Sequence, residues 1–329
     1  MRDALAIIGC GRIGKVHART IKEHLPGIDL VVSDADQQAA HDLARAVGGQ
    51  VVSAEDVWEH PGLRAVAICT STDTHLEYIV RAAEAGVPVF CEKPISLDLD
   101  EVHRAQQAVR ESGIPFMVGF HKRFDPTHRA TKQAVIDGRV GDVHLLRITT
   151  RDPQPPPREY LKASGGIFLD MTIHDFDMAC FMVDSPVVEV FARGAVLIDP
   201  VFEEVGDFDT AVVWMRHASG AMTVIDNSRR ATYGHDQRVE VFGSAGMASS
   251  TNERVDAAEI FDGAGRHGAL VPYHFLERYS QAYVQEWLAF WSYLTEGGPS
   301  PVSIDDARIP VELGVKAIES ARSGLPVTV

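Results

Sequence analysis

Hydrophobic and polar positions follow one rhythm over the first 120 residues of the chain. Short continuous apolar runs alternate there with longer stretches in which apolar residues recur every three to four positions. The runs are typical of strands buried on both faces, and the longer stretches are typical of amphipathic helices. Strands that alternate with helices in this way predict a parallel, doubly wound sheet. We predict its strands at residues 4–8, 30–33, 50–52, 65–69, 87–91 and 115–120.

From residue 121 onward the rhythm changes. The pattern predicts a helix at 127–137, a strand at 143–150 and a helix from residue 167. Beyond residue 187 apolar and polar residues alternate, which is typical of strands with one solvated face. Short turns between these strands, such as His217 to Gly220, predict antiparallel pairing. The predicted strands are 187–197, 209–216, 221–226, 238–242 and 259–261, and helices at 275–294 and 304–323 close the chain.

The fold class predicted from these rhythms is α/β with two domains. Residues 1–120 are expected to form a Rossmann domain with a doubly wound parallel sheet. Residues 121–329 are expected to form an α/β domain with a large, mostly antiparallel open sheet. The last helix is a candidate to pack back on the first domain. The chain has 329 residues, which is long enough for two domains of this size.

A glycine-rich turn follows the first predicted strand. It reads Gly9-Cys10-Gly11-Arg12-Ile13-Gly14, and a helical pattern continues to about residue 25. This motif between a strand and a helix is the fingerprint of a dinucleotide site, because its glycines allow a tight turn and a close approach of the pyrophosphate. The first N–H groups of the helix then face the phosphates. We predict Gly9, Gly11, Arg12, Ile13 and Gly14 as cofactor-binding residues.

An acidic residue lies where this fingerprint expects one. Asp34 ends the second predicted strand, about twenty residues after the last glycine, and can accept hydrogen bonds from the ribose hydroxyls of the cofactor. Asp36 is close by and no Arg or Lys follows directly, so a 2′-phosphate would meet negative charge. The sequence therefore favours NAD over NADP. The alternative is a glycine turn with a solvated Asp.

Two further predicted strands end in polar residues. Thr70 follows the fourth strand, and Glu92 and Lys93 follow the fifth. Open α/β sheets bind ligands at the carboxyl ends of their strands, so we predict these three residues to lie at the cofactor. Lys93, fixed beside Pro94, can also donate a hydrogen bond to a substrate hydroxyl. Its position alone leaves open that it is a solvated lysine at the end of a strand.

The segment from Gly165 to Met178 carries the strongest candidate chemistry. Its apolar residues recur at helical spacing, and Asp170 and His174 are four residues apart, on one face of the predicted helix. A carboxylate beside an imidazole orients the ring and prepares it to take a proton from a hydroxyl. A surface ion pair is the simpler alternative. A metal site is a third, but no further His or Cys cluster lies nearby, and we expect no metal.

Composition and charge exclude several classes of protein. Hydrophobic residues make up 45% and charged residues 23%, as in ordinary globular proteins, and the net charge of −15 argues against binding nucleic acid or an anionic membrane. No apolar run is long enough for a signal peptide or a membrane span. The four cysteines are far apart and suggest neither disulfides nor a zinc site. We expect a reduced, cytoplasmic protein. The cysteines are Cys10, Cys69, Cys91 and Cys180.

Four segments, in this order, resemble the glucose–fructose oxidoreductase / inositol dehydrogenase / rhizopine-catabolism family over essentially the whole chain. They are the glycine loop, Cys91-Glu-Lys-Pro, residues 119–126 and residues 165–177. Residues 165–178 and 227–243 look most like its inositol 2-dehydrogenase branch. The resemblance implies an NAD-dependent enzyme acting on a polyol or sugar, with a second domain that binds substrate and forms a homodimer or homotetramer. It implies Lys93, Asp170 and His174 as catalytic residues that also bind substrate, and Arg123, Asp152 and Tyr233 as further substrate contacts.

The leading hypothesis is therefore oxidation of a ring hydroxyl of a cyclic polyol, most simply myo-inositol to 2-keto-myo-inositol. His174 would take the hydroxyl proton, and Lys93 would hydrogen-bond the same oxygen. Three departures from the family pattern, at His121-Lys122, Ser71 and His235, leave another inositol isomer or an aldose open. A non-catalytic dinucleotide sensor and a hydrolase with tightly held NAD are alternatives of other classes.

Overall fold

The computed structural model describes residues 2–329. The chain divides into two compact units, and each is built from two parts of the sequence. The first unit contains the N-terminal residues to His121 together with Tyr283–Val311. The second contains Lys122–Ala282 and Glu312–Val329. No helix among residues 2–329 is long and apolar enough to cross a membrane.

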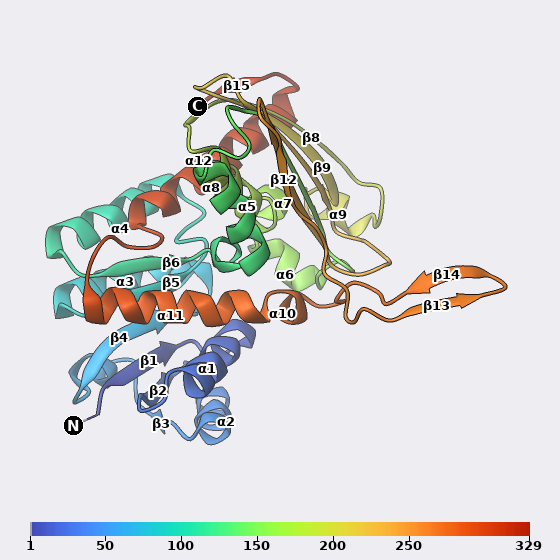
Figure 1. The fold of residues 1–329 in the computed structure, drawn as a ribbon. Coiled ribbons are helices and arrows are strands. Elements are labelled where there is room, and N and C mark those ends of the chain that lie inside the picture. The colour runs from blue at the N-terminus through green and yellow to red at the C-terminus, as the bar shows by residue number, and fades with distance from the viewer. Residues whose placement is uncertain (1) are drawn as a thin grey trace. The chain divides into compact units, whose positions relative to one another are not determined.

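The first unit contains a six-stranded, fully parallel sheet with the order β3-β2-β1-β4-β5-β6 (Figure 1). The order reverses between β1 and β4, which is where doubly wound sheets open a crevice for a ligand. Its central strands are buried along their length. The predicted Rossmann sheet is confirmed. The strands are Ala4–Ile8 (β1), Asp29–Ser33 (β2), Gln50–Val51 (β3), Leu63–Ile68 (β4), Val89–Glu92 (β5) and Phe116–Gly119 (β6).

The helices of this unit begin and end at local signals in the sequence. The carboxylates of Asp36 and Asp98 cap two of them by accepting hydrogen bonds from N–H groups in the first turn. Residues 56–59 form only a short 3-10 turn, Asp56–Glu59, because Pro61 disfavours helical backbone at the residue before it. The helices are Arg12–His24 (α1), Gln37–Val47 (α2), His75–Ala85 (α3), Leu99–Ser112 (α4) and most of Ser280–Glu296 (α11).

The second unit contains a seven-stranded sheet with the order β12-β11-β7-β10-β9-β8-β15. All neighbouring strands pair antiparallel except β7 and β10, which run parallel. The predicted, mostly antiparallel sheet is confirmed, although its edge strands β12 and β15 were not predicted. The strands are Val143–Arg151 (β7), Val187–Ala195 (β8), Thr210–His217 (β9), Met222–Ser228 (β10), Asp236–Gly243 (β11), Met247–Ser250 (β12) and Val327–Thr328 (β15).

One face of this sheet is covered and the other is open. Helix α5, Pro126–Ile136, packs on β11 and β12, and α8, Ile173–Val183, packs on β7. Alternate residues of β7 on that face, from Leu146 to Thr150, are buried. The opposite face exposes Val212, Met222, Phe242 and Met247. The remaining elements are α6 (Arg158–Ala163), α7 (Gly166–Asp170), α9 (Val201–Glu204), α10 (Phe275–Arg278), α12 (Ile304–Ser323) and the hairpin β13 (Glu259–Asp262) and β14 (Gly265–Gly268).

The continuous helix predicted from residue 167 is wrong, because the segment is broken into α7 and α8. Thr172 lies at the break, and its hydroxyl donates to the carbonyl of Ile167 at 3.1 Å or to the side-chain oxygen of Asn227 at 2.6 Å. A threonine hydroxyl competes in this way with the backbone hydrogen bonds of a helix. The helix predicted at 275–294 is likewise divided, into α10 and α11.

Candidate active site

The glycine loop lies between β1 and α1, and its three glycines meet different surroundings. Gly9 has a φ of +100°, and a Cβ there would lie 2.5 Å from the backbone of Cys69. A Cβ on Gly14 would lie 1.9 Å from the carbonyl oxygen of Gly9. By contrast, no atom of the described residues lies within 4 Å of a Cβ built on Gly11. Gly9 and Gly14 therefore shape the loop, and Gly11 leaves open space where a phosphate can approach.

The N-terminal end of α1 suits the phosphates of a dinucleotide. Arg12 and Ile13 begin the helix, no side chain among residues 2–329 caps it, and no acidic residue lies in its first turn. Its first N–H groups and the positive end of its dipole therefore lack a competing anion from the helix itself.

Asp34 joins the glycine loop to the end of β2. One of its carboxylate oxygens accepts a hydrogen bond from the backbone N–H of Cys10 at 2.5 Å, and the other accepts from the N–H of Asp36 at 2.8 Å. The carboxylate is thus held beside the loop, where the fingerprint places the acid for the ribose. Together with the open space at Gly11, this arrangement fits NAD.

Glu92 and Lys93 end β5 at the carboxyl edge of the same sheet. Glu92 is buried, and its Oε1 lies 2.6 Å from Nε2 of His17 on α1. Its Oε2 accepts a hydrogen bond from the backbone N–H of Lys93 at 3.1 Å. Lys93 is followed by a cis peptide bond to Pro94. Strand β5 and helix α1 therefore fix the backbone of Lys93.

Thr70 stands at the end of β4, the neighbouring strand. Its hydroxyl accepts a hydrogen bond from Thr74 at 2.7 Å. The ring of His75, which sequence reasoning missed, lies between the carbonyl oxygens of Thr70 and Pro94 at 3.1 and 2.8 Å. This histidine ties the two strand ends together. The predicted cofactor residues of the first unit thus gather on the carboxyl edges of β1, β4 and β5.

In the second unit, Asp170 lies at the end of α7 and is nearly buried. Its carboxylate accepts hydrogen bonds from the hydroxyl of Tyr160 at 2.7 Å and from Nη1 of Arg229 at 2.9 Å. His174 is half-buried in the first turn of α8. The predicted acid and base therefore lie on two helices on either side of the Thr172 break.

Arg229 connects Asp170 to a second predicted residue, Asp152. Its Nη1 lies 3.6 Å from a carboxylate oxygen of Asp152, whose other oxygen lies 3.5 Å from Nδ1 of His235. Arg229 is only 2% exposed. Burial disfavours its charge, but Asp170 and Asp152 outweigh burial and raise the pKa of Arg229. Burial raises the pKa of Asp152, although Arg229 opposes the shift.

Sequence reasoning missed Arg229 and Tyr160. A buried arginine cannot be told from a solvated one in a loop such as 229–235, and the exposed Arg230 beside it looks the same in the sequence. The Asp152–Arg229–Asp170 cluster, which we define by these three residues, brings together two of the predicted substrate contacts.

Arg123 is engaged elsewhere. Its Nε and Nη2 donate to the carboxylate of Asp177 at 3.0 and 2.6 Å, and Asp177 is fully buried. Lys122 donates from Nζ to Asp175 at 2.9 Å, and Asp175 also accepts from Asn227 at 2.8 Å. These pairs attach the loop before α5 to α8. Asp177, seven residues after Asp170 in the sequence, thus pairs with Arg123.

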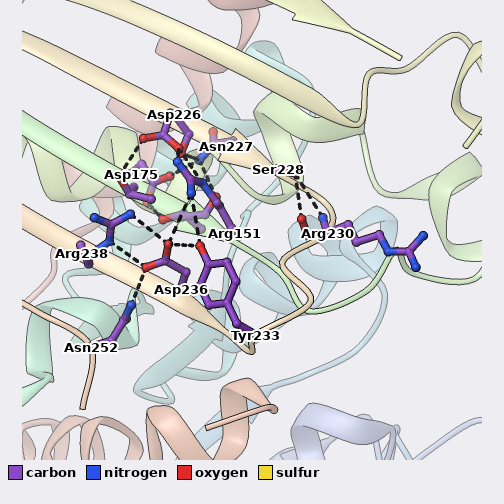
Figure 2. Close-up of polar contacts among 12 residues, drawn as sticks. Arg151, Asp175, Asp226, Asn227, Ser228, Arg230, Tyr233, Asp236, Arg238 and Asn252 are labelled. Atoms are coloured by element: carbon purple, nitrogen blue, oxygen red, sulfur yellow. Dashed lines mark hydrogen bonds and ion pairs between the residues drawn. The ribbon is translucent and has the colours of Figure 1, made fainter. Parts of the chain in front are cut away.

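Tyr233 belongs to a different cluster (Figure 2). Its hydroxyl donates to Asp236 at 2.6 Å and accepts from Nη1 of Arg151 at 3.2 Å, and its side chain is 43% exposed. Arg151 also pairs with Asp226 at 2.6 Å, on the open face of the sheet. The structure thus brings Asp152 and Asp170 together and leaves Tyr233 outside their cluster.

Comparison with known proteins identifies the family. Residues 4–120 match the model of the oxidoreductase family with an NAD-binding Rossmann fold, and residues 128–249 match the GFO/IDH/MocA C-terminal domain. A myo-inositol 2-dehydrogenase from Thermotoga maritima is 43% identical over 324 residues, which cover 97% of each chain. This chain belongs to the GFO/IDH/MocA family. The predicted resemblance, the oxidoreductase class and NAD as cofactor are thereby confirmed.

Solved structures of family members have the same fold. A probable dehydrogenase from Thermotoga maritima superposes with a TM-score of 0.96 at 42% identity, covering 99% of this chain and 98% of that one. A scyllo-inositol dehydrogenase from Lactobacillus casei, with bound NAD(H) and scyllo-inositol, gives a TM-score of 0.93 at 27% identity and covers 100% and 99% of the two chains.

Proposed function

We propose that this protein is an NAD-dependent dehydrogenase that oxidises a ring hydroxyl of a cyclic polyol, with myo-inositol converted to 2-keto-myo-inositol as the first choice. The similarity to the Thermotoga maritima enzyme named for that reaction supports the choice of substrate. The observation that carries the chemistry is Asp170, held by Tyr160 and Arg229 four residues before His174. A fixed carboxylate four residues before a half-buried imidazole suits proton abstraction from an alcohol.

Each catalytic residue has a separate role in this proposal. His174 takes the proton of the hydroxyl, and Asp170 stabilises and orients its ring. Lys93 donates a hydrogen bond to the same oxygen. When bound, NAD supplies the acceptor for the hydride of the carbinol carbon. The protein itself takes up only the hydroxyl proton, on His174. These roles therefore do not require the substrate to carry a charged group.

The Asp152–Arg229–Asp170 cluster supports a neutral, hydroxyl-rich ligand. Its two carboxylates outnumber its one guanidinium, so it offers no excess positive charge to a carboxylate substrate. Carboxylate oxygens accept hydrogen bonds from hydroxyls, and a site of this kind rejects analogues that lack them. We place Asp152 at the substrate for this reason.

Other features of the sequence-based prediction remain proposals. We infer a homodimer or homotetramer, since the open face of the second sheet exposes apolar side chains. We also infer a cytoplasmic location, in keeping with the buried thiols of Cys10, Cys69 and Cys91, which form no disulfide among residues 2–329. Arg123 and Tyr233 keep their proposed substrate roles only if ligand binding rearranges their present contacts with Asp177 and Asp236.

Initial rates of NADH formation test the proposal. The panel contains myo-, scyllo- and chiro-inositol, glucose, xylose and a linear polyol, and His174→Ala is the control for chemistry at the site. We expect the highest kcat/KM for an inositol. A preference for scyllo-inositol or glucose would change the assigned substrate but keep it a cyclic polyol or sugar. Activity confined to linear alcohols or hydroxy acids would overturn the proposed substrate class. NAD binding without turnover would favour a sensor, and co-purified NAD that never accumulates as NADH would favour a hydrolase.

A further inference from the structure

His17 lies at the centre of a buried cluster in the first unit. It comes from α1, the helix that begins at the glycine loop, and its side chain is inaccessible to solvent. Its ring packs edge-on against Phe90 of β5 and against Tyr283 and Trp287 of α11, with centroid separations of 5.0 to 5.7 Å. Three elements distant in sequence therefore meet around this imidazole.

The hydrogen bonds of His17 fix its tautomer. The indole nitrogen of Trp287 lies 2.9 Å from Nδ1 of His17. An indole N–H can only donate a hydrogen bond. Nδ1 must therefore be the acceptor, and the ring proton lies on Nε2. Nε2 in turn lies 2.6 Å from Oε1 of Glu92, so His17 donates to this carboxylate. The ring is consequently neutral, with one nitrogen accepting and the other donating.

Glu92 links His17 to the backbone of Lys93. Its second oxygen accepts the backbone N–H of Lys93 at 3.1 Å, so both oxygens of Glu92 are in use. Gly119 lies directly beside this carboxylate, since a Cβ built there would be 3.3 Å from the carboxyl carbon of Glu92. The carboxylate can hardly move without breaking one of its two bonds.

A second acid, Glu286, lies on the same helix as Tyr283 and Trp287. Glu286 of α11 is fully buried, and neither of its carboxyl oxygens has a hydrogen-bond partner among residues 2–329. Burial, and then the charge of Glu92, raise the pKa of Glu286 well above its usual value. The raised pKa favours the protonated form of Glu286, and His17 makes its carboxylate contact with Glu92.

We propose that Trp287, His17 and Glu92 form a relay of hydrogen bonds that positions Lys93. His17 and Trp287 are positioning residues in this proposal, since neither has to touch the substrate. The inference rests on the proposed function, because it assigns their effect to the substrate role of Lys93. It also ties Lys93 to α1, the helix whose first turn receives the phosphates of NAD.

Variants of His17 test the relay. His17→Leu removes both bonds, whereas His17→Gln keeps an amide N–H for Glu92 and an acceptor for Trp287. A reacting group displaced by about 1 Å can lose about 100-fold in rate. We expect a kcat loss of that order for His17→Leu, partial rescue in His17→Gln, and a Kd for NAD changed less than about threefold. His24→Leu, at an exposed position of the same helix, is the matched control.

Two measurements separate the relay from a general loss of structure and from the proposed function. Amide hydrogen exchange reports the Lys93 N–H directly, and His17→Leu should accelerate it while leaving the amides of β1 protected. Nitrogen NMR of labelled histidine should show His17 as the Nε2–H tautomer. Neither measurement requires a polyol substrate, so failure of the substrate panel would leave them valid.

Trp287→Phe is the milder variant in case His17→Leu does not fold. It keeps the ring and removes only the N–H donor, so we expect the same changes at reduced size, about tenfold or less in kcat. Trp291→Phe on the same helix is its control. An unchanged exchange rate at Lys93 in both relay variants, or an Nδ1–H tautomer of His17 in the wild type, would overturn the proposal.

Discussion

Arg229 donates a hydrogen bond of 2.9 Å to Asp170 from a position that is almost completely buried. The same guanidinium nitrogen lies 3.6 Å from Asp152. A buried cation between two carboxylates compensates part of the desolvation of all three groups, and removal of the cation would leave the carboxylates uncompensated. The geometry of Asp170 therefore depends on a residue that is remote from it in sequence.

Replacement of Arg229 should affect both stability and turnover. In Arg229→Met the buried Asp170 and the half-buried Asp152 lose their cation, and the free energy of unfolding should fall by about 3–5 kcal/mol, as is usual when one partner of a buried ion pair is removed. Urea unfolding measures this loss. Arg230→Met, at the exposed neighbouring position, should change stability by less than about 0.5 kcal/mol. Equal effects of the two variants would show that Arg229 is not a buried anchor.

The general architecture could be predicted because it depends on local patterns. The buried strands β1, β4 and β5 are continuous apolar runs, and the glycine loop has a fixed spacing between a strand and a helix. Strand β8 ends at Ala195, two residues before the predicted end, because the N–H groups from Leu197 onward donate to the carboxylate of Asp209 instead of to a neighbouring strand. That competing acceptor lies on a later segment, so the pattern of apolar and polar residues in the strand itself does not reveal it.

The site could be predicted only in part, for a related reason. The spacing of Asp170 and His174 is visible in the sequence, but their division between α7 and α8 depends on Thr172 and its partner Asn227 in β10. Arg229 and Tyr160 act through contacts with Asp170 across 59 and 10 positions of sequence. Pairings of this kind follow from the folded chain and have no periodic signal.

Acid should destabilise the protein through two buried histidines. Burial lowers the pKa of both His128 and His235 to about 3, from 6.5. Between pH 6.5 and 3, each histidine binds fewer protons in the folded chain than in the unfolded chain. The stabilisation from the neutral rings is therefore fully present above about pH 6.5 and is lost as the pH falls toward 3.

The slope of unfolding free energy against pH measures this effect. Each histidine can contribute up to about 1.4 kcal/mol per pH unit between the two pKa values. We expect His128→Gln to flatten the slope between pH 6 and 4 relative to the wild type, by up to about that amount. His103→Gln, at an exposed position on α4, should leave the slope unchanged. A wild-type stability independent of pH in this range would contradict a neutral, buried His128.

Asp34 and Asp36 should behave differently although they are near neighbours. Asp34 holds the glycine loop through Cys10, whereas Asp36 caps α2. The double variant Asp34→Ser with Ala35→Arg should move preference from NAD toward NADP, because it removes the negative charge and adds a cation for a 2′-phosphate. Asp36→Ala should cost about 1 kcal/mol of stability without changing cofactor preference. Ratios of kcat/KM for the two cofactors decide, and a wild type that already uses NADP equally would refute the role of Asp34.

His174→Ala should reduce turnover by roughly the 10²–10⁴-fold expected for a lost general base, with little change in the Kd for NAD. Asp170→Asn should also impair turnover, because the amide cannot stabilise the imidazolium as a carboxylate does. Steady-state kinetics with the best polyol of the panel measure both. Near-normal turnover in both variants would leave the two residues with a structural role.

Two alanine variants of the glycine loop should separate effects on folding from effects on cofactor binding. Gly11 has a φ of −69°, which alanine adopts readily, and no atom of residues 2–329 lies within 4 Å of an added Cβ. Gly11→Ala should therefore fold with a melting temperature close to that of the wild type, yet bind NAD at least about tenfold more weakly, because the methyl group occupies the space of the pyrophosphate. Gly14→Ala meets the carbonyl of Gly9 at 1.9 Å, so it should lower the melting temperature as well as the affinity. Thermal unfolding and NAD titration on both variants test this pair. If Gly11→Ala binds NAD as tightly as the wild type, the pyrophosphate does not pass over this glycine.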